Sequence, residues 1–142
     1  MKSVAQLLKT KGGGIFAISP DASVLDCVKL LAEKSIGAVL VMEGDRLVGI
    51  ISERDYARKV VLQGRSSKDT PVREIMTANV ISVTPRQTNE ECMALMTDKR
   101  IRHLPVVDGG KVTGVVSIGD LVRDIIEEQQ AAIQQLERYI HG

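Results

Sequence analysis

Aromatic side chains are scarce in this chain, which has one Phe, two Tyr and no Trp. Proteins that bind single-stranded nucleic acid stack bases on such rings, so this class is disfavoured. An excess of charge of one sign is also lacking, since 19 Lys and Arg face 18 Asp and Glu, for a net charge of +1. Without a strong field of one sign, we expect neither nucleic acid nor a membrane surface among the partners.

Long apolar runs are absent as well, and none approaches the roughly 18 residues that span a bilayer. The N-terminal stretch MKSVAQLLKTKGGG has too short an apolar centre for a signal peptide. It predicts instead a short helix that the glycines end, with an apolar side made of Val4, Ala5, Leu7 and Leu8. The only two cysteines, Cys27 and Cys92, lie far apart, which favours free thiols in a reducing compartment, taken here to be the cytoplasm.

A set of reacting side chains is the third absence. No G-x-S-x-G nucleophile turn occurs, and Gly12–Gly14 is not followed by the Lys and Ser or Thr of a phosphate-binding loop. His103 and His141 lack a metal ligand at a suitable spacing, and both cysteines fall on apolar helix faces, where packing is the simpler role. We therefore expect no enzyme, no catalytic cofactor and no metal, although an enzyme with an unrecognised site stays open.

What the chain does contain is an internal repeat. Its 142 residues suit one domain, and a shift of 65 aligns Gly14–Val61 with Asn79–Ile126 without a gap. A repeat of this length indicates a duplicated subdomain rather than a solenoid unit. The matched pairs include Pro20 and Pro85, Cys27 and Cys92, Gly49 and Gly114, Ser52 and Ser117, and Asp55 and Asp120.

Each half predicts the order β-α-β-β-α. The β-rich runs IFAIS and VISVT end at Pro20 and Pro85, and apolar residues at helical spacing follow. In the second half, Thr88 and Glu91 have the spacing of a capping box. Two buried strands then turn at glycine-rich hairpins, and the returning strand leads into a helix. The expected fold is α+β, with two such subdomains packed pseudo-symmetrically into one module, because neither half alone would bury its sheet.

Five segments follow from this pattern. We expect an N-terminal helix and glycine linker at 1–14, a first subdomain at 15–63, a linker at 64–78, a second subdomain at 79–126 and a helical extension at 127–142. Within the linker, Gly64–Thr70 predicts an exposed loop and Val72–Met76 a short helical turn. The tail predicts one long helix that packs back on its own module or forms a dimer contact. Its expected apolar face, interrupted by Gln129, consists of Val122, Ile125 or Ile126, Ile133, Leu136 and Ile140.

The most informative repeated phrase is GIISERD at Gly49–Asp55 and GVVSIGD at Gly114–Asp120. Serine and aspartate three residues apart share one side of a first helical turn, where free N–H groups and the helix dipole suit an anion such as phosphate. The aspartate can accept hydrogen bonds from two vicinal ribose hydroxyls. In the simpler alternative, the serine caps the helix and the aspartate is its capping partner. The residues alone leave both interpretations open.

This chain resembles a tandem pair of CBS domains, also called a Bateman module, from Ile15 to Ile126, and it is most similar to small stand-alone members. The likeness is carried by IRHLPVV, by glycine-rich hairpins and by G-h-h-S-x-x-D occurring twice. The resemblance implies binding of AMP, ADP, ATP, NAD or a related adenosyl ligand in clefts between the halves, and pairing into a homodimer. Because no effector domain is present, the module would act on an unidentified partner protein.

The resemblance also implies roles for individual residues. Asp55 and Asp120 match the ribose-binding aspartates, and Ser52 and Ser117 line the phosphate side. The surroundings of adenine and phosphate are matched by two strand-entry segments and two first-strand segments: Ile36, Gly37 and Ala38; Ile101, Arg102, His103 and Pro105; Ile15, Phe16 and Ala17; Val80, Ile81 and Ser82.

The two clefts are predicted to be unequal. The Asp120 cleft would collect Arg102 and His103, with Arg54 crossing from the other half, and these groups suit a phosphate chain. The Asp55 cleft has Gly37 and Ala38 at the equivalent positions and would receive Gly119, from the variable Ile118-Gly119 pair of the other phrase. We therefore expect the Asp120 cleft to bind phosphate more strongly, unless Arg102 and His103 form surface salt bridges instead.

Two functions are weighed against each other. The first is a regulatory module that senses energy or redox state through an adenosyl ligand and acts through a partner protein. The second is a structural or protein-interaction dimer whose nucleotide clefts are vestigial. The aspartates discriminate between them, because only the first function needs Asp120 for ligand binding.

Overall fold

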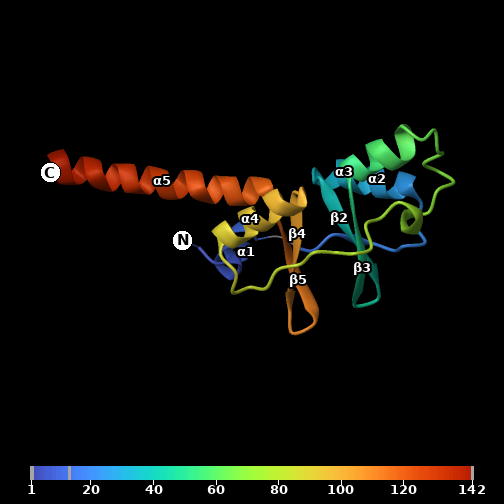
Figure 1. The fold of residues 1–142 in the computed structure, drawn as a ribbon, viewed down its shortest axis with the longest axis horizontal. Helices are drawn as coiled ribbons and strands as arrows, with labels where there is room; N and C mark the ends of the chain where they lie inside the picture. The colour runs from blue at the N-terminus through green and yellow to red at the C-terminus, as the bar shows by residue number, and fades with distance from the viewer. Residues whose placement is uncertain (1, 13, 142) are drawn as a thin grey trace. The chain divides into compact units, whose positions relative to one another are not determined.

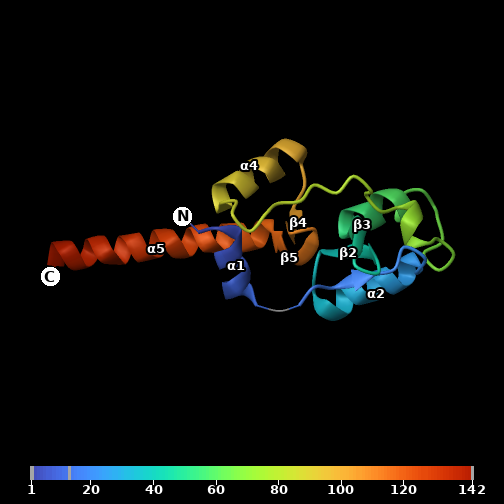
Figure 2. The ribbon, with the colours of Figure 1, turned by 90° about the horizontal axis from the view of Figure 1, so that it is seen from below.

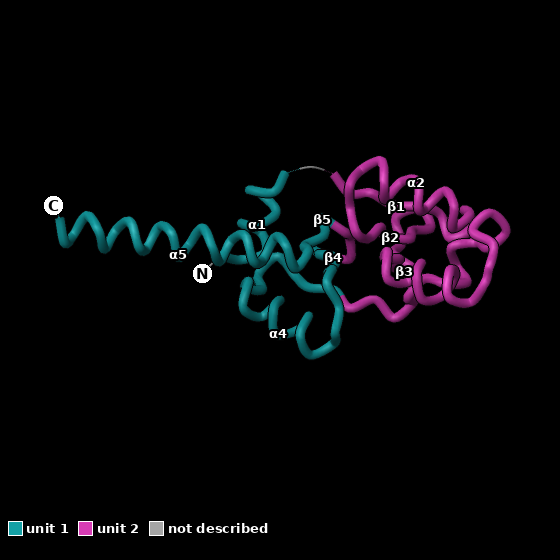
Figure 3. Tube along the Cα trace, turned by 90° about the horizontal axis from the view of Figure 1, so that it is seen from above, with its two compact units in different colours: residues 1–13, 82–108, 113–142 teal, residues 14–81, 109–112 magenta. Residues whose placement is uncertain are grey.

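The computed structural model describes residues 2–12 and 14–141, and these residues form two compact units. Unit 1 combines the N-terminal segment with 82–108 and 113–142, and unit 2 comprises 14–81 with the hairpin tip at 109–112 (Figure 3). The N-terminal segment therefore groups with the second half of the repeat. Each unit is described by itself below.

Unit 2 has the predicted β-α-β-β-α order. Strand β1 (Ala17–Ile18) runs parallel to β2 (Ala38–Glu43), which pairs antiparallel with β3 (Arg46–Ser52). Helix α2 (Val24–Lys34) connects β1 to β2, and α3 (Glu53–Tyr56) follows β3 and continues as a π-helical turn at Ala57–Val61 (Figure 1). The linker contains the predicted short turn as a 3-10 helix, Val72–Glu74.

The core of unit 2 follows from two periodicities. Val24, Cys27 and Leu31 recur at helical spacing on α2 and are buried. Against this face pack alternate residues of the strands, including Val39 and Val41, as expected when one sheet face covers a helix. The burial of these residues confirms the apolar pattern that the sequence predicts for the first half.

Unit 1 contains α4 (Asn89–Lys99), the antiparallel hairpin of β4 (His103–Asp108) and β5 (Lys111–Ser117), and α5 (Ile118–His141). The prediction of a strand at VISVT is wrong, because Val83 alone in this segment makes a bridge, to Val106. Val83 donates to the carbonyl of Pro105 and accepts from Val107, and Pro85, two residues on, has no N–H to extend the ladder. The first strand of unit 2 is also shorter than predicted.

Local signals in the sequence fix the ends of the helices. Thr88 and Glu91 form the predicted capping box at the start of α4.

The hairpin glycines Gly44 and Gly109 both have φ of 58°, a conformation that glycine adopts without strain. The predicted turns between the paired strands are thereby confirmed.

Helix α1 (Val4–Lys11) confirms the predicted N-terminal helix, which ends at Gly12. It occupies in unit 1 the place that the linker occupies in unit 2. The Val4 N–H donates to the Gln87 carbonyl at 2.8 Å. The Val72 N–H donates, also at 2.8 Å, to the carbonyl of Ala22, the residue that aligns with Gln87 in the repeat. Each half of the repeat is thus completed by the segment that precedes the other half.

This exchange explains the glycine that begins each repeated phrase. A Cβ on Gly114 would lie 2.7 Å from a methyl carbon of Leu8 in α1. A Cβ on Gly49 would lie 2.5 Å from the sulfur of Met76 in the linker. The glycines therefore leave room on the second strand of each half for a side chain from the covering segment.

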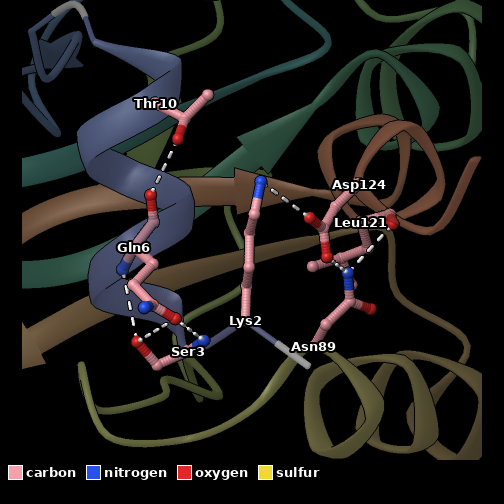
Figure 4. Close-up of polar contacts among 7 residues, drawn as sticks. All are labelled: Lys2, Ser3, Gln6, Thr10, Asn89, Leu121 and Asp124. Atoms are coloured by element: carbon pink, nitrogen blue, oxygen red, sulfur yellow. Dashed lines mark hydrogen bonds and ion pairs between the residues drawn. The ribbon is translucent and has the colours of Figure 1, made fainter. Parts of the chain in front are cut away.

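A buried polar cluster fastens α1 and α4 to α5 (Figure 4). The side-chain N–H groups of Asn89 donate to the Leu121 carbonyl at 3.0 Å and to Asp124 Oδ2 at 2.9 Å. Lys2 Nζ lies 3.2 Å from the other oxygen of Asp124, whose carboxylate is buried. Because a buried carboxylate needs partners, this cluster fixes which turn of α5 faces α1.

The rest of α5 confirms the predicted single long helix. It runs past α1 and α4, and every described residue from 126 onward is exposed (Figures 1 and 2). No described helix is long and apolar enough to cross a membrane.

Candidate functional site

The repeated Ser-x-x-Asp motif lies in both units where a strand ends and a helix begins. Ser52 N donates to Asp55 Oδ2 at 2.9 Å, and Asp55 N donates to Ser52 Oγ at 3.2 Å. Ser117 N donates to Asp120 Oδ2 at 2.8 Å, and Asp120 N donates to Ser117 Oγ at 3.2 Å. The capping interpretation is therefore realised in both copies. It does not exclude ligand binding, because an ionised carboxylate has about four acceptor positions and capping uses only part of them.

The strand-entry segments are fastened to these turns. The Glu53 N–H donates to the Gly37 carbonyl at 3.0 Å, and the equivalent Ile118 N–H donates to the Arg102 carbonyl at 2.9 Å. Unit 2 thus brings Ile36–Ala38 beside the Ser52–Asp55 turn. Unit 1 brings 101–103 beside the Ser117–Asp120 turn, with Gly119 exposed on that turn.

The aspartates differ in the cations that they meet. Asp120 Oδ2 lies 2.8 Å from Lys11 Nζ, and Asp120 Oδ1 lies 3.8 Å from a guanidinium nitrogen of Arg123. Asp55 Oδ1 lies 3.2 Å from Lys59 Nζ, on the same helical run four residues on. Lys11 and Lys59 are both absent from the predicted residues. The i, i+4 spacing could have identified Lys59, whereas no local pattern links Lys11 to Asp120.

The electrostatics of the Asp120 turn are dominated by Lys11. Burial works to raise the pKa of Asp120, but hydrogen bonds from Lys11 and Ser117 and the charge of Lys11 outweigh it, so the pKa is lowered. Burial, followed by the charge of Lys11, lowers the pKa of His103, against a smaller opposing effect of Asp120. His103 is therefore a neutral imidazole at neutral pH, so the cations beside this turn are Lys11, Arg102 and Arg123.

The remaining predicted residues are more scattered. Ile15, Ala17 and Arg54 are exposed in unit 2, where Ala17 pairs with Leu40 in the parallel ladder. Val80 and Ile81 are half-buried in unit 2, whereas Ser82 is exposed and Pro105 buried in unit 1. The expected reach of Arg54 to the Asp120 cleft and of Gly119 to the Asp55 cleft joins different units and stays a prediction.

The cysteines are packing residues, as predicted. Cys27 and Cys92 are free and buried. Burial raises the pKa of both thiols to about 11, with smaller contributions from Asp55 and Glu91 respectively, so the reactive thiolate is disfavoured. Within residues 2–12 and 14–141, no group of three or more His, Cys, Asp or Glu is arranged to hold a metal ion.

Comparison with known proteins gives consistent matches over nearly the whole chain. A family model described as CBS domain matches residues 9–62 and 72–127. CBS domain-containing protein CBSX3, mitochondrial, of Arabidopsis thaliana is 42% identical over 149 residues, which cover 99% of this chain and 72% of the plant protein. A solved CBS-domain protein of Burkholderia ambifaria MC40-6 is similar with a TM-score of 0.87 and 57% identity, over 90% of this chain and 96% of that chain.

A further solved structure contains ligands. The CBS domain pair of protein MJ0100, in complex with 5′-methylthioadenosine and S-adenosyl-L-methionine, has a TM-score of 0.78 and 27% identity to this chain. The match covers 87% of this chain and 99% of that chain.

Proposed function

The chain belongs to the CBS-domain family, and on that basis we propose that it is a regulatory module that binds an adenosyl ligand at its Ser-x-x-Asp turns. The single observation that supports this most strongly is the state of Asp120. Its carboxylate is only partly accessible, is kept ionised by Lys11 and Ser117, and has one oxygen that capping does not use. A ribose, with two vicinal hydroxyl donors, matches such an acceptor.

The residues around Asp120 divide between the parts of the ligand. Asp120 accepts hydrogen bonds from the ribose hydroxyls, while the start of α5, with Ser117 and Gly119, faces the phosphate. Arg102 supplies a cation, and His103 supplies a neutral imidazole that can donate or accept one hydrogen bond. Apolar contacts to adenine come from Ile101 and its neighbours on this side of unit 1.

The Asp55 turn forms a second, weaker site in this proposal. Its strand-entry segment, Ile36–Ala38, carries no side-chain cation, and Asp55 is already paired with Lys59. Lys59 Nζ also donates to the Ile75 carbonyl at 3.0 Å. The site can accept a ribose but has less to offer a phosphate chain.

The proposed ligands are AMP, ADP, ATP or NAD, so the module would report energy or redox state. A ligand changes the output only through different affinity for two states of the protein. No reaction is proposed, and the output is an interaction with a partner protein. The free buried thiols are compatible with a reducing compartment such as the cytoplasm.

A second candidate function, self-association, is favoured by α5. Val122, Ile126, Ile133, Leu136 and Ile140 are all large, apolar and at least 40% exposed. With Gln129 they recur at alternating spacings of four and three residues, the pattern that buries a helix against a second helix. We propose that α5 pairs with α5 of a second copy, so that the sensor is a homodimer.

Thermal unfolding with AMP, ADP, ATP, NAD and S-adenosylmethionine tests the sensor. The variant Asp120→Asn retains an oxygen for the cap but loses the charge, and Asp98→Asn, an exposed residue of α4, is the matched control. A ligand at about 100 times its dissociation constant adds about 2.7 kcal/mol and raises the midpoint by several degrees. We expect this rise in the wild type and in Asp98→Asn and its loss in Asp120→Asn. If none of the adenosyl ligands raises the midpoint, or if the midpoint rises equally in all three proteins, the proposal is contradicted.

A further inference from the structure

Lys11, the last residue of α1, contacts Asp120, the proposed ribose acceptor. Lys11 Nζ is 2.8 Å from Asp120 Oδ2 and 2.8 Å from the carbonyl oxygen of Val115. Two of the three ammonium donors are therefore engaged, while the side chain is still 38% exposed. Lys11 lies outside the aligned repeat.

The backbone of α1 is fixed, so that only the side chain of Lys11 is free to move. Lys2, just before α1, pairs with Asp124, one turn along α5 from Asp120 (Figure 4). Leu8 packs against Gly114, and the Val4 N–H is bonded to the Gln87 carbonyl. Lys11 therefore extends from a helix attached at both ends, on a flexible four-carbon stem.

A ribose and Lys11 compete for the same oxygen. Asp120 Oδ2 already accepts hydrogen bonds from the Ser117 N–H and from Lys11, and Oδ1 faces Arg123. Two vicinal hydroxyls that bind both oxygens must displace the ammonium from Oδ2. The displaced ammonium then lacks a direct anionic partner while it stays near another cation, Arg123, which is unfavourable in a partly desolvated position.

We propose that Lys11 selects for an anionic 5′ group by exchanging its partner, leaving Asp120 and pairing with the phosphate of the ligand. This inference rests on the proposed function and adds a specificity residue to it. A 5′-phosphate supplies the counter-ion that the displaced ammonium needs. A neutral nucleoside, or a ligand with a cationic sulfonium, displaces Lys11 from the carboxylate but offers its ammonium no anionic partner. The site therefore discriminates between ligands that share adenine and ribose.

The test compares AMP with adenosine by isothermal titration at one ionic strength. In Lys11→Met, AMP loses a charged contact and we expect about tenfold weaker binding, whereas adenosine no longer competes with an ammonium and binds about threefold more tightly. Lys11→Arg retains the charge and should keep the preference for AMP. Lys9→Met removes an exposed lysine from the same last turn of α1 and should leave both affinities unchanged.

The outcomes separate the two proposals. If the wild type binds neither ligand, the sensor function fails and the role of Lys11 fails with it. Suppose instead that the wild type binds AMP through Asp120, but Lys11→Met changes the affinities for AMP and adenosine by the same factor or changes neither. The sensor function then stands, and only the proposed exchange of partners by Lys11 is wrong. Lys11→Gln repeats the comparison with a polar side chain if methionine disturbs the end of α1. In the ligand-free protein, the carboxyl resonance of Asp120 must titrate at higher pH in Lys11→Met, or the contact is absent in solution.

Discussion

The Asp55 and Asp120 turns share one backbone design and differ in the charges around it. Both close the same reciprocal hydrogen bonds with a serine, and both are fastened to a strand-entry carbonyl. Yet Asp55 is neutralised by Lys59 from its own helical run, and Asp120 by Lys11 from a distant helix. Duplication therefore explains the shared backbone of the two turns, whereas the cation at Asp120 comes from a segment outside the repeat.

The same contrast extends one turn further along the helices. Position 124 in the second half corresponds to 59 in the first, and Asn89 corresponds to Val24. The first half therefore has an apolar residue where the second has a buried amide, and an exposed lysine where the second has a buried aspartate. Unit 1 is held by a polar cluster at a place where unit 2 relies on apolar packing.

Breaking that polar cluster should have the largest effect. Asp124→Ala leaves the Asn89 amide with one acceptor fewer and Lys2 without its partner. We expect a loss of about 3 kcal/mol in the free energy of unfolding, at the lower end for a buried pair because Lys2 is partly exposed. Lys59→Ala, at the equivalent position, should cost less than about 1 kcal/mol, because the Lys59 side chain is 44% exposed and its charge stays partly solvated. Urea unfolding measures both.

A double variant separates the effect of polar pairing from the effect of packing at this cluster. Asn89→Val with Asp124→Leu replaces the polar cluster by apolar residues, and the first of these changes gives position 89 the residue type of the equivalent Val24. It should recover most of the stability lost in Asp124→Ala, because no buried group is left unpaired. Equal instability of the double and single variants would show that packing, rather than pairing, explains the loss.

Adding a side chain at either repeated glycine should have the next largest effect on stability. Gly49→Val and Gly114→Val place carbon where Met76 and Leu8 lie, and each should cost about 2 kcal/mol through overpacking. Gly14→Val is the matched control, because nothing lies near its added side chain. The midpoint of thermal unfolding should fall by several degrees in the first two variants only.

A second change tests the origin of that loss. Leu8→Ala opens space above Gly114, so combining it with Gly114→Val should cost less than the sum of the two single changes. Strict additivity would contradict the packing of α1 on this strand.

Self-association should depend on the exposed apolar face of α5 and not on the corresponding part of the first half. Ile133→Glu should weaken dimerisation by about tenfold, or about 1.4 kcal/mol, since it introduces a charge into the proposed contact. Leu62→Glu changes an exposed apolar residue beyond the helix of the first half and should have no effect. Sedimentation equilibrium over a range of concentrations measures both, and equal weakening by the two variants would remove α5 as the contact.

The smallest expected effect is a dependence of stability on pH. The pKa of His103 is lowered in the folded protein, so the unfolded chain binds more protons as pH falls through its own His pKa of about 6.5, and stability falls with it. His103→Gln should flatten this part of the curve. The pKa of Asp120 is also lowered, so its contribution is complete above about pH 5 and is lost as pH falls below about 4. Lys11→Met should reduce that acid-range slope.

Much of the fold could be predicted because its signals are local. The capping box of Thr88 and Glu91, the glycine hairpins and the apolar spacing on α2 each need only a few adjacent residues. The strand predicted before Pro85 failed because pairing depends on a partner strand, and only Val83 finds one.

The candidate site was predictable only in part, for the same reason. Ser117 and Asp120 follow from the repeat, but Lys11 reaches Asp120 across 109 residues. That contact depends on where α1 packs, and the packing is set by Leu8 over Gly114 and by Lys2 on Asp124. No spacing in the sequence encodes it.

Calorimetric titration of AMP into three proteins tests whether Asp120 is the main ligand acceptor and Asp55 the weaker one. These are the wild type, Asp120→Asn and Asp55→Asn, in which both changes keep an oxygen for the cap. We predict that Asp120→Asn removes the tighter binding event, whereas Asp55→Asn retains it. Binding to Asp120→Asn with the affinity and stoichiometry of the wild type would show that Asp120 is not the main acceptor.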